Sequence, residues 1–238
     1  MALGPAASSP IVAAMPVHVR MPVGAIALAP GGDATCEVAV TNTGPTADRF
    51  TFEVLGTASS WTTLDPPVLA LPPGTVGRLA VHFHPPRAAH VRAGTTPFGL
   101  LTTSDDGTST SVVEELLVVD RFTELSAELI PRVQQGRTAT YRLVLRNGGN
   151  STLHVSVSGR DLGGVLAIGC FPPGLTVFPG KTRSCRVRVR PSRRRWCGET
   201  TPRQFQIVAR PEGEDPFLLE GTLLQRPLLP QPLLPRPR

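Results

Sequence analysis

Eight positively charged residues fall within fifteen positions in the second half of the chain, and arginine suits them to binding anions. They are Lys181, Arg183, Arg186, Arg188, Arg190, Arg193, Arg194 and Arg195. The guanidinium group presents a planar fork of donors that matches carboxylates and phosphates. Apolar residues alternate with the central arginines, so a strand here places Arg186, Arg188 and Arg190 on one face, ~6.6–6.8 Å apart. The pattern predicts a surface for an anionic partner; the alternative is a solvated strand whose charges resist edge aggregation.

The loop after this predicted strand extends the charged surface. Arg193, Arg194 and Arg195 precede Trp196, an indole that can stack on or anchor a partner. Aromatic residues are only 5% of the chain, however, and nucleic acids need aromatic platforms for their bases. We therefore predict a protein partner with an acidic surface, and regard nucleic acid as the less favoured one.

The C-terminal tail, residues 227–238, is a second candidate docking element. It contains the sequence PLLP twice, which places Leu228, Leu229, Leu233 and Leu234 between prolines. Proline-rich segments favour the stiff polyproline II conformation, which loses little entropy on binding. The tail is therefore predicted to dock on a partner; the alternative is a strap packed on its own domain.

The chain contains no recognisable catalytic or metal-binding set. There is no G-x-S-x-G elbow, and the four cysteines show no C-x-x-C spacing typical of zinc sites. His82 and His84 point to the same side of a predicted strand, but no third ligand is evident. We predict a protein without catalytic residues, cofactor or metal.

The cysteines and the N-terminus indicate a reducing compartment. Met1 to Met15 carry no basic segment, and the first charged residue is Arg20, so a secretory signal is not recognised. We expect cytoplasmic localisation, free or within a large particle. The cysteines are expected to be reduced, although their pairing stays open.

Composition favours an all-β chain. Among 238 residues there are 23 glycines and 26 prolines, a density that disfavours long helices. No apolar run approaches the length of a membrane-spanning helix. Charge divides unevenly, with net −5 over residues 1–120 and net +11 over residues 121–238.

An internal repeat defines the domains. The segment 66–87 aligns with 172–193, and 34–44 aligns with 139–149, so the chain duplicates a unit of about 105 residues. Each unit shows short alternating segments separated by Pro-Gly or Asn-x-Gly turns, which is typical of an immunoglobulin-like β-sandwich. We predict two such sandwiches with the following bounds: an N-terminal segment 1–14, an acidic domain 15–120, a basic domain 121–226 and the tail 227–238.

The alternating strand that ends in Asn-x-Gly, followed by a Pro-Gly turn and a strand ending in proline, resembles bacterial Ig-like modules of the NEW3 type. The whole chain, with its RPLLP tail, resembles an actinobacterial family loosely labelled "hydrolytic protein". Members of that family occur near gene clusters for phage-tail-like contractile injection particles. The resemblance implies a role as a component or accessory of such a particle.

These observations predict a non-catalytic structural or adaptor protein that mediates protein–protein contacts. The acidic first repeat is itself a candidate partner, which would give head-to-tail self-association. One alternative is a pilus-type two-domain chaperone, which needs a secretory signal. Another is a carbohydrate-binding accessory module, which needs exposed aromatics; outside phenylalanine only Trp61, Tyr141 and Trp196 are available.

Overall fold

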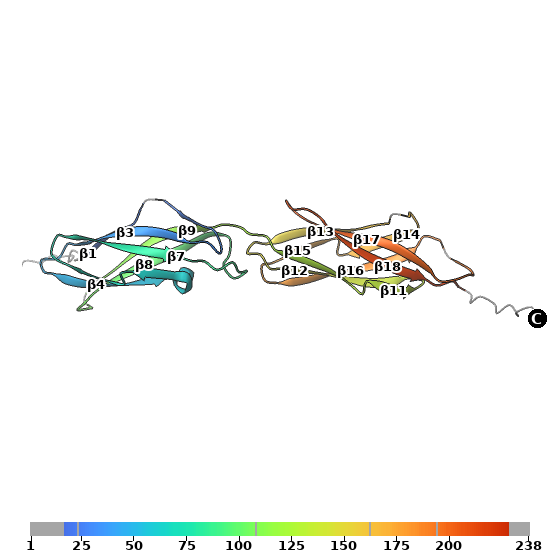
Figure 1. The fold of residues 1–238 in the computed structure, drawn as a ribbon, viewed down its shortest axis with the longest axis horizontal. Coiled ribbons are helices and arrows are strands. Elements are labelled where there is room, and N and C mark those ends of the chain that lie inside the picture. The colour runs from blue at the N-terminus through green and yellow to red at the C-terminus, as the bar shows by residue number, and fades with distance from the viewer. Residues whose placement is uncertain (1–16, 23, 108, 162, 194, 229–238) are drawn as a thin grey trace, which may run out of the picture. The chain divides into compact units, whose positions relative to one another are not determined.

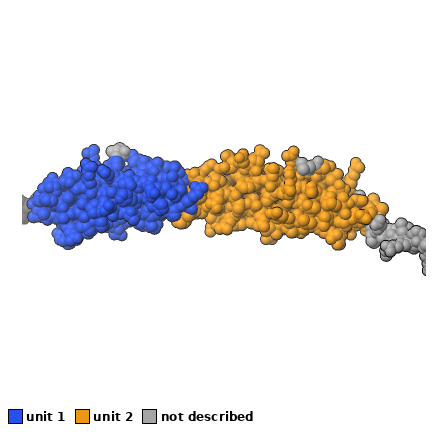
Figure 2. All heavy atoms as spheres, in the orientation of Figure 1, with its two compact units in different colours: residues 1–87, 94–120 blue, residues 88–93, 121–238 orange. Residues whose placement is uncertain are grey.

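Alternating apolar and polar residues form strands throughout both repeats. The computed structural model describes residues 17–22, 24–107, 109–161, 163–193 and 195–228, so the predicted N-terminal segment 1–14 lies outside the described residues. The chain divides into two compact units, coloured separately in Figure 2: unit 1 is residues 1–87 with 94–120, and unit 2 is residues 88–93 with 121–238. Segment 88–93, inside the span predicted for the first domain, therefore groups with unit 2.

Unit 1 is built from two mainly antiparallel sheets packed face to face (Figure 1). One sheet has the order β1-β3-β7-β5 and the other β2-β9-β8-β4-β6, with β2 joining β9 in parallel. A 3-10 helix, Thr57–Trp61, connects β4 to β5. The strands are β1 (Val17–Arg20), β2 (Ile26–Leu28), β3 (Ala34–Asn42), β4 (Asp48–Leu55), β5 (Thr62–Asp65), β6 (Val68–Leu71), β7 (Val76–Phe83), β8 (Gly94–Ser104) and β9 (Thr110–Val119).

Unit 2 repeats this topology strand for strand. Its sheets have the orders β10-β12-β16-β14 and β11-β18-β17-β13-β15, and β11 joins β18 in parallel. Each sheet position in unit 1 thus has its counterpart in unit 2. The strands are β10 (Leu125–Ile130), β11 (Val133–Gly136), β12 (Ala139–Asn147), β13 (Leu153–Arg160), β14 (Leu166–Phe171), β15 (Gly174–Val177), β16 (Thr182–Pro191), β17 (Thr201–Pro211) and β18 (Phe217–Gln225).

The fold is two tandem immunoglobulin-like β-sandwiches, which confirms the predicted fold class. The repeat noticed in the sequence reflects a duplicated structure, because β3 and β12, and likewise β7 and β16, hold the same places in equivalent sheets. The edge strands β5 and β14 were not expected, because segments of four and six residues give little periodicity to recognise.

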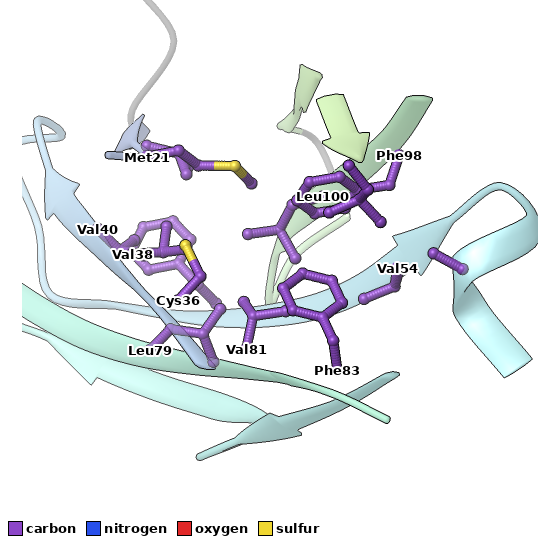
Figure 3. Close-up of a cluster of buried hydrophobic side chains, with 14 of the residues drawn as sticks. Met21, Cys36, Val38, Val40, Val54, Leu79, Val81, Phe83, Phe98 and Leu100 are labelled. Atoms are coloured by element: carbon purple, nitrogen blue, oxygen red, sulfur yellow. The ribbon is translucent and has the colours of Figure 1, made fainter. Parts of the chain in front are cut away.

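The core of unit 1 lies between its two sheets. In Figure 3, Val81 and Phe83 of β7 point toward Phe98 and Leu100 of β8, and the Phe83 and Phe98 rings meet edge to face with centroids 5.4 Å apart. Edge-to-face contact is a preferred geometry for aromatic pairs in a core. Trp61, at the end of the 3-10 helix, also packs here, 6.2 Å from the Phe83 ring. It is therefore partly buried and not part of an exposed aromatic surface.

The core of unit 2 is separate and is centred on Tyr141 and Phe205, whose ring centroids lie 5.0 Å apart. Tyr141 is 1% exposed, and its hydroxyl donates to the Thr222 carbonyl at 2.8 Å. Burial raises the pKa of Tyr141 to about 12. With Tyr141 in the core and Trp61 packed inside unit 1, Trp196 alone of the three aromatics considered for carbohydrate binding is exposed.

A buried asparagine fixes the same corner of each sandwich. The Asn42 amide donates to the Thr46 and Leu71 carbonyls, both at 2.8 Å, and its oxygen accepts the Gly44 N–H at 2.9 Å. Asn147 makes the corresponding contacts, donating to the Ser151 and Val177 carbonyls and accepting from Gly149. Both side chains are fully buried. The asparagine of each Asn-x-Gly sequence therefore connects its own turn to the end of a strand in the other sheet.

Candidate functional site

Strand β16 presents the predicted arginines to solvent. Cys185, Val187 and Val189 are buried, whereas Arg186, Arg188 and Arg190 are exposed on the outer side of the strand. This alternation is what the sequence predicted, because successive side chains of a strand point to opposite faces. The neighbouring strands β12 and β14 determine which other side chains lie on that face.

Strand β12 adds two arginines that the sequence analysis did not single out. Arg142 lies directly opposite Arg186 in the ladder between β12 and β16, and Arg146 lies further along the same face of β12, beyond the half-buried Val144. The arginine face is defined here as Arg142, Arg146, Arg186, Arg188 and Arg190. Residues opposite each other in antiparallel strands have Cβ atoms ~4.5–5.5 Å apart, so two of its charges repel at close range. Only the pairing register of the strands reveals this juxtaposition.

The charges of the arginine face are not neutralised within the part of the chain that the structure describes. None of the five arginines makes an ion pair with a described residue. One acidic residue, Glu128 on β10, shares the face and lies opposite Val144, diagonal to Arg142 and Arg146. Net positive charge therefore remains on this sheet, and the potentials of Arg142, Arg186 and Arg188 add because neighbouring positions among them lie within a Debye length of about 8–10 Å.

The equivalent face of unit 1 carries fewer arginines, and one of them has an acidic partner. Glu37 on β3 occupies the position equivalent to Arg142, and it pairs with Arg78 at 3.2 Å. His84 contacts Asp33 at 2.6 Å, and His82 contacts the Thr35 hydroxyl at 2.9 Å. The two repeats share a fold but differ in this electrostatic property, so the fold alone does not require an uncompensated arginine face.

An exposed aromatic ring stands beside the arginines. Phe171 ends β14, opposite Arg186 in the ladder, and is 59% exposed. Its ring covers Gly169, where an added Cβ would lie 2.7 Å from the ring. Ile130, at the end of β10, is also exposed and lines the same shallow groove as Arg186 and Arg188. Arginines next to an exposed aromatic side chain are typical of interface hot spots.

Asp161 holds the loop that leads into β14. Its carboxylate accepts the N–H groups of Val165 and Leu166 at 2.5 and 2.6 Å, and that of Gly163 at 3.0 Å. Burial acts to raise the pKa of Asp161, but these hydrogen bonds and the nearby Arg203 outweigh it and lower the pKa. The carboxylate is thus ionised near neutral pH and holds Leu166, the first residue of β14, the strand that ends at Phe171.

The loop after β16 and the start of the tail come together at one end of unit 2. Arg190, Arg193 and Arg195 line a hollow there, with Arg137 and Arg226 from other segments. Trp196 is 67% exposed and does not line this hollow. Arg194 lies outside the described residues. The sequence analysis missed Arg137 and Arg226 because each is isolated in the sequence.

The first residues of the tail are attached to unit 2. The Leu228 N–H donates to the Arg195 carbonyl at 2.9 Å, and the Leu228 side chain is half-buried in the same hollow. Leu228 is thus held on its own domain, as in the alternative of a strap, and its role in binding a partner stays a prediction. Leu229, Leu233 and Leu234 lie outside the described residues, and their docking role stays a prediction.

The remaining candidates are the histidines, the acidic residues and the cysteines. No group of three or more histidine, cysteine or acidic side chains capable of holding a metal occurs among the described residues. Within the same ranges, no helix is long and apolar enough to cross a membrane. All four cysteines are free thiols, and burial raises the pKa of Cys36, Cys170 and Cys185, that of Cys170 to about 11. Such thiols are poor nucleophiles at neutral pH.

Comparison with known proteins identifies no family. No protein-family model and no curated protein matches the sequence. Similar solved structures include the D00-D0 domain of intimin, at 10% identity over 86% of this chain and 96% of that chain, with a TM-score of 0.37. A protein of unknown function from Porphyromonas gingivalis W83 is 16% identical over 88% of this chain and 99% of that one, with a TM-score of 0.32.

The titin domains z1z2, solved in complex with telethonin, match at 13% identity over 89% of this chain and 96% of that chain, with a TM-score of 0.31. At these scores the likeness carries no functional argument. What this chain does must be argued from its own surfaces.

Proposed function

We propose that the protein is a non-catalytic adaptor that binds an acidic protein surface through the arginine face of unit 2. The observation that carries this proposal is the difference between the two repeats. The equivalent face of unit 1 pairs Arg78 with Glu37, whereas five arginines in unit 2 have no ion-pair partner among the described residues. An acidic partner would relieve the repulsion between Arg142 and Arg186 and bury the exposed ring of Phe171.

The assembly in which the adaptor works is also a proposal. The family resemblance noted in the sequence favours a phage-tail-like contractile injection particle, with the protein in the cytoplasm or incorporated into the particle. The acidic first repeat of another copy is a second source of the same partner chemistry, because residues 1–120 carry net −5. Co-sedimentation with purified particles tests the first setting. The molecular mass of the protein in solution at low salt shows whether copies associate and so tests the second.

The direct test is a charge reversal on the face. In Arg186→Glu/Arg188→Glu both substituted residues are exposed, so folding should be retained. Tagged wild-type protein and the variant are used to capture partners from native cells at 50, 150 and 500 mM salt, with quantification by mass spectrometry. A true partner should fall at least tenfold in the variant and decline with salt in the wild type, because exposed charges are screened.

The matched control reverses two exposed arginines on the equivalent sheet of unit 1, in Arg20→Glu/Arg78→Glu. It changes the net charge by the same amount and should leave partner capture within about twofold. If both double variants lose the partner equally, the attraction is a property of net charge and the proposal fails. If both double variants capture the same proteins as wild type in the same amounts, the arginine face is only a solvated surface.

A further inference from the structure

The hollow at the end of unit 2 is strongly positively charged. It encloses about 730 Å³, and five of its lining residues are arginines. No acidic side chain is among the lining residues that the structure describes. The arginine pocket is defined here by these five arginines: Arg137, Arg190, Arg193, Arg195 and Arg226.

Backbone and side-chain hydrogen bonds hold the walls of this pocket together without a ligand. The Leu228 N–H donates to the Arg195 carbonyl at 2.9 Å, and the Arg226 N–H donates to the Gly136 carbonyl at 3.1 Å. The Gln225 side chain, 5% exposed, donates to the Arg193 carbonyl at 3.2 Å. Three segments far apart in the sequence are thereby fixed around one cavity, so little ordering would be needed when an anion binds.

The guanidinium groups in the pocket keep their charge available. Arg195 donates to the Thr201 hydroxyl, and Arg226 donates to the side-chain oxygen of Gln135 at 3.0 Å. Both acceptors are neutral, so they orient the guanidinium groups without neutralising their positive charge. The guanidinium groups of Arg137, Arg190 and Arg193 have no hydrogen-bond or ion-pair partner among the described residues.

The equivalent place in unit 1 shows what a compensated version looks like. His84 takes the position of Arg190, and it contacts the carboxylate of Asp33 at 2.6 Å. In unit 2 the residue that corresponds to Asp33 is Thr138, a neutral hydroxyl that lines the pocket. The two repeats can therefore be compared directly. In unit 1 the carboxylate of Asp33 contacts the basic residue, whereas in unit 2 the neutral Thr138 leaves Arg190 without an acidic partner.

From this geometry we infer that the arginine pocket binds a small molecule with two or three linked phosphates. Arginine forks bind phosphate oxygens bidentately, and the Thr138 and Ser192 hydroxyls supply further donors. A terminal phosphate carries about −1.5 to −2 charges near neutral pH, so two or three phosphates balance five arginines where one carboxylate would not. The volume also exceeds what a single phosphate fills.

Calorimetric titration with inorganic tripolyphosphate tests this site in the full-length protein. At 50 mM salt, wild-type protein should bind tripolyphosphate at least tenfold more tightly than orthophosphate. The pocket variant Arg137→Gln/Arg193→Gln should lose at least tenfold in affinity. Adenosine diphosphate and triphosphate, titrated next, distinguish a nucleotide source of the phosphates from an inorganic one.

The matched control is Arg142→Gln/Arg186→Gln, which removes the same charge from the arginine face and leaves Arg190 of the pocket intact. Its affinity for tripolyphosphate should stay within about threefold of wild type. Equal losses in the two double variants, or no binding by wild-type protein at 50 mM salt, would overturn the assignment. Because protein capture uses the face variant and titration uses the pocket variant, this site and the adaptor function can fail independently.

Discussion

At the scale of single residues, Asn42 and Asn147 show how one side chain determines a corner of the fold. Each side-chain amide donates to two backbone carbonyls and accepts from one backbone N–H. Buried backbone groups must be paired, so a residue with both donors and an acceptor is needed at this position. The asparagine and the glycine two residues later could be recognised from the sequence as a turn, but their burial could not.

Replacing Asn147 by alanine should destabilise unit 2 by about 2–4 kcal/mol, because three buried polar groups lose their partner at once. Calorimetry of the full-length protein should show the transition of unit 2 at a lower temperature. Asn147→Asp keeps the acceptor for the Gly149 N–H but has no amide to donate, so a loss is still expected. A change below about 0.5 kcal/mol in Asn147→Ala would show that water replaces the amide.

Thiol reactivity is predicted to separate the cysteines. Cys197 is exposed and should be alkylated first at pH 7.5, whereas Cys36, Cys170 and Cys185 should react far more slowly. Burial raises the pKa of Cys170 to about 11, and only the thiolate reacts, so its rate should rise roughly tenfold per pH unit until pH 11. Mass spectrometry of iodoacetamide adducts shows the order of labelling in wild-type protein, and the same measurement in Cys197→Ser gives the pH dependence of the Cys170 rate. Rapid labelling of Cys170 at pH 7.5 would contradict its burial.

At the scale of elements, the residues that lie beside the arginines of strand β16 come from the neighbouring strands. Its alternation of buried and exposed residues follows from the sequence, and the outward position of Arg186 and Arg188 was predicted correctly. The positions of Arg142 on β12 and Phe171 on β14 beside them depend on the pairing register. A strand pattern specifies which face a residue occupies, but not which strand lies alongside.

The tail can be divided at Leu228 by two deletions. Removing residues 229–238 should leave the melting temperature within about one degree of wild type, because the Leu228 attachment remains. Removing 227–238 also deletes a hydrogen bond and a half-buried leucine, worth about 1–2 kcal/mol, and should lower the melting temperature by several degrees. Thermal denaturation followed by circular dichroism compares them. Equal stability of the two truncated proteins would show that the attachment is not important for folding.

At the scale of the whole molecule, each unit has a core of its own. The cluster around Phe83 and Phe98 belongs to unit 1, and the cluster around Tyr141 and Phe205 belongs to unit 2. Separate hydrophobic cores are what allow domains to fold independently. The opposite charges of residues 1–120 and 121–238, net −5 and net +11, are thus carried by parts of the chain with separate cores.

Fragments 1–120 and 121–238 should each fold alone. We expect β-type circular dichroism and a cooperative thermal transition from both, since all sheet partners of every strand lie within one fragment. Mixing the fragments at 50 mM and 500 mM salt in an analytical ultracentrifuge then measures attraction between the acidic and the basic repeat. An unfolded fragment 121–238 would mean that segment 88–93, which groups with unit 2, is required for its stability.

The sequence by itself determined the all-β class, the duplication, most long strands and the outward direction of the β16 arginines. These properties follow from alternation, turn residues and self-similarity, which are local or repeated signals. Tertiary structure alone decided that Arg137, Arg193 and Arg226 line one pocket, that Tyr141 is buried and that the loop captures Leu228. Sheet order and register bring together residues about ninety positions apart, and no local pattern specifies which distant strands will meet.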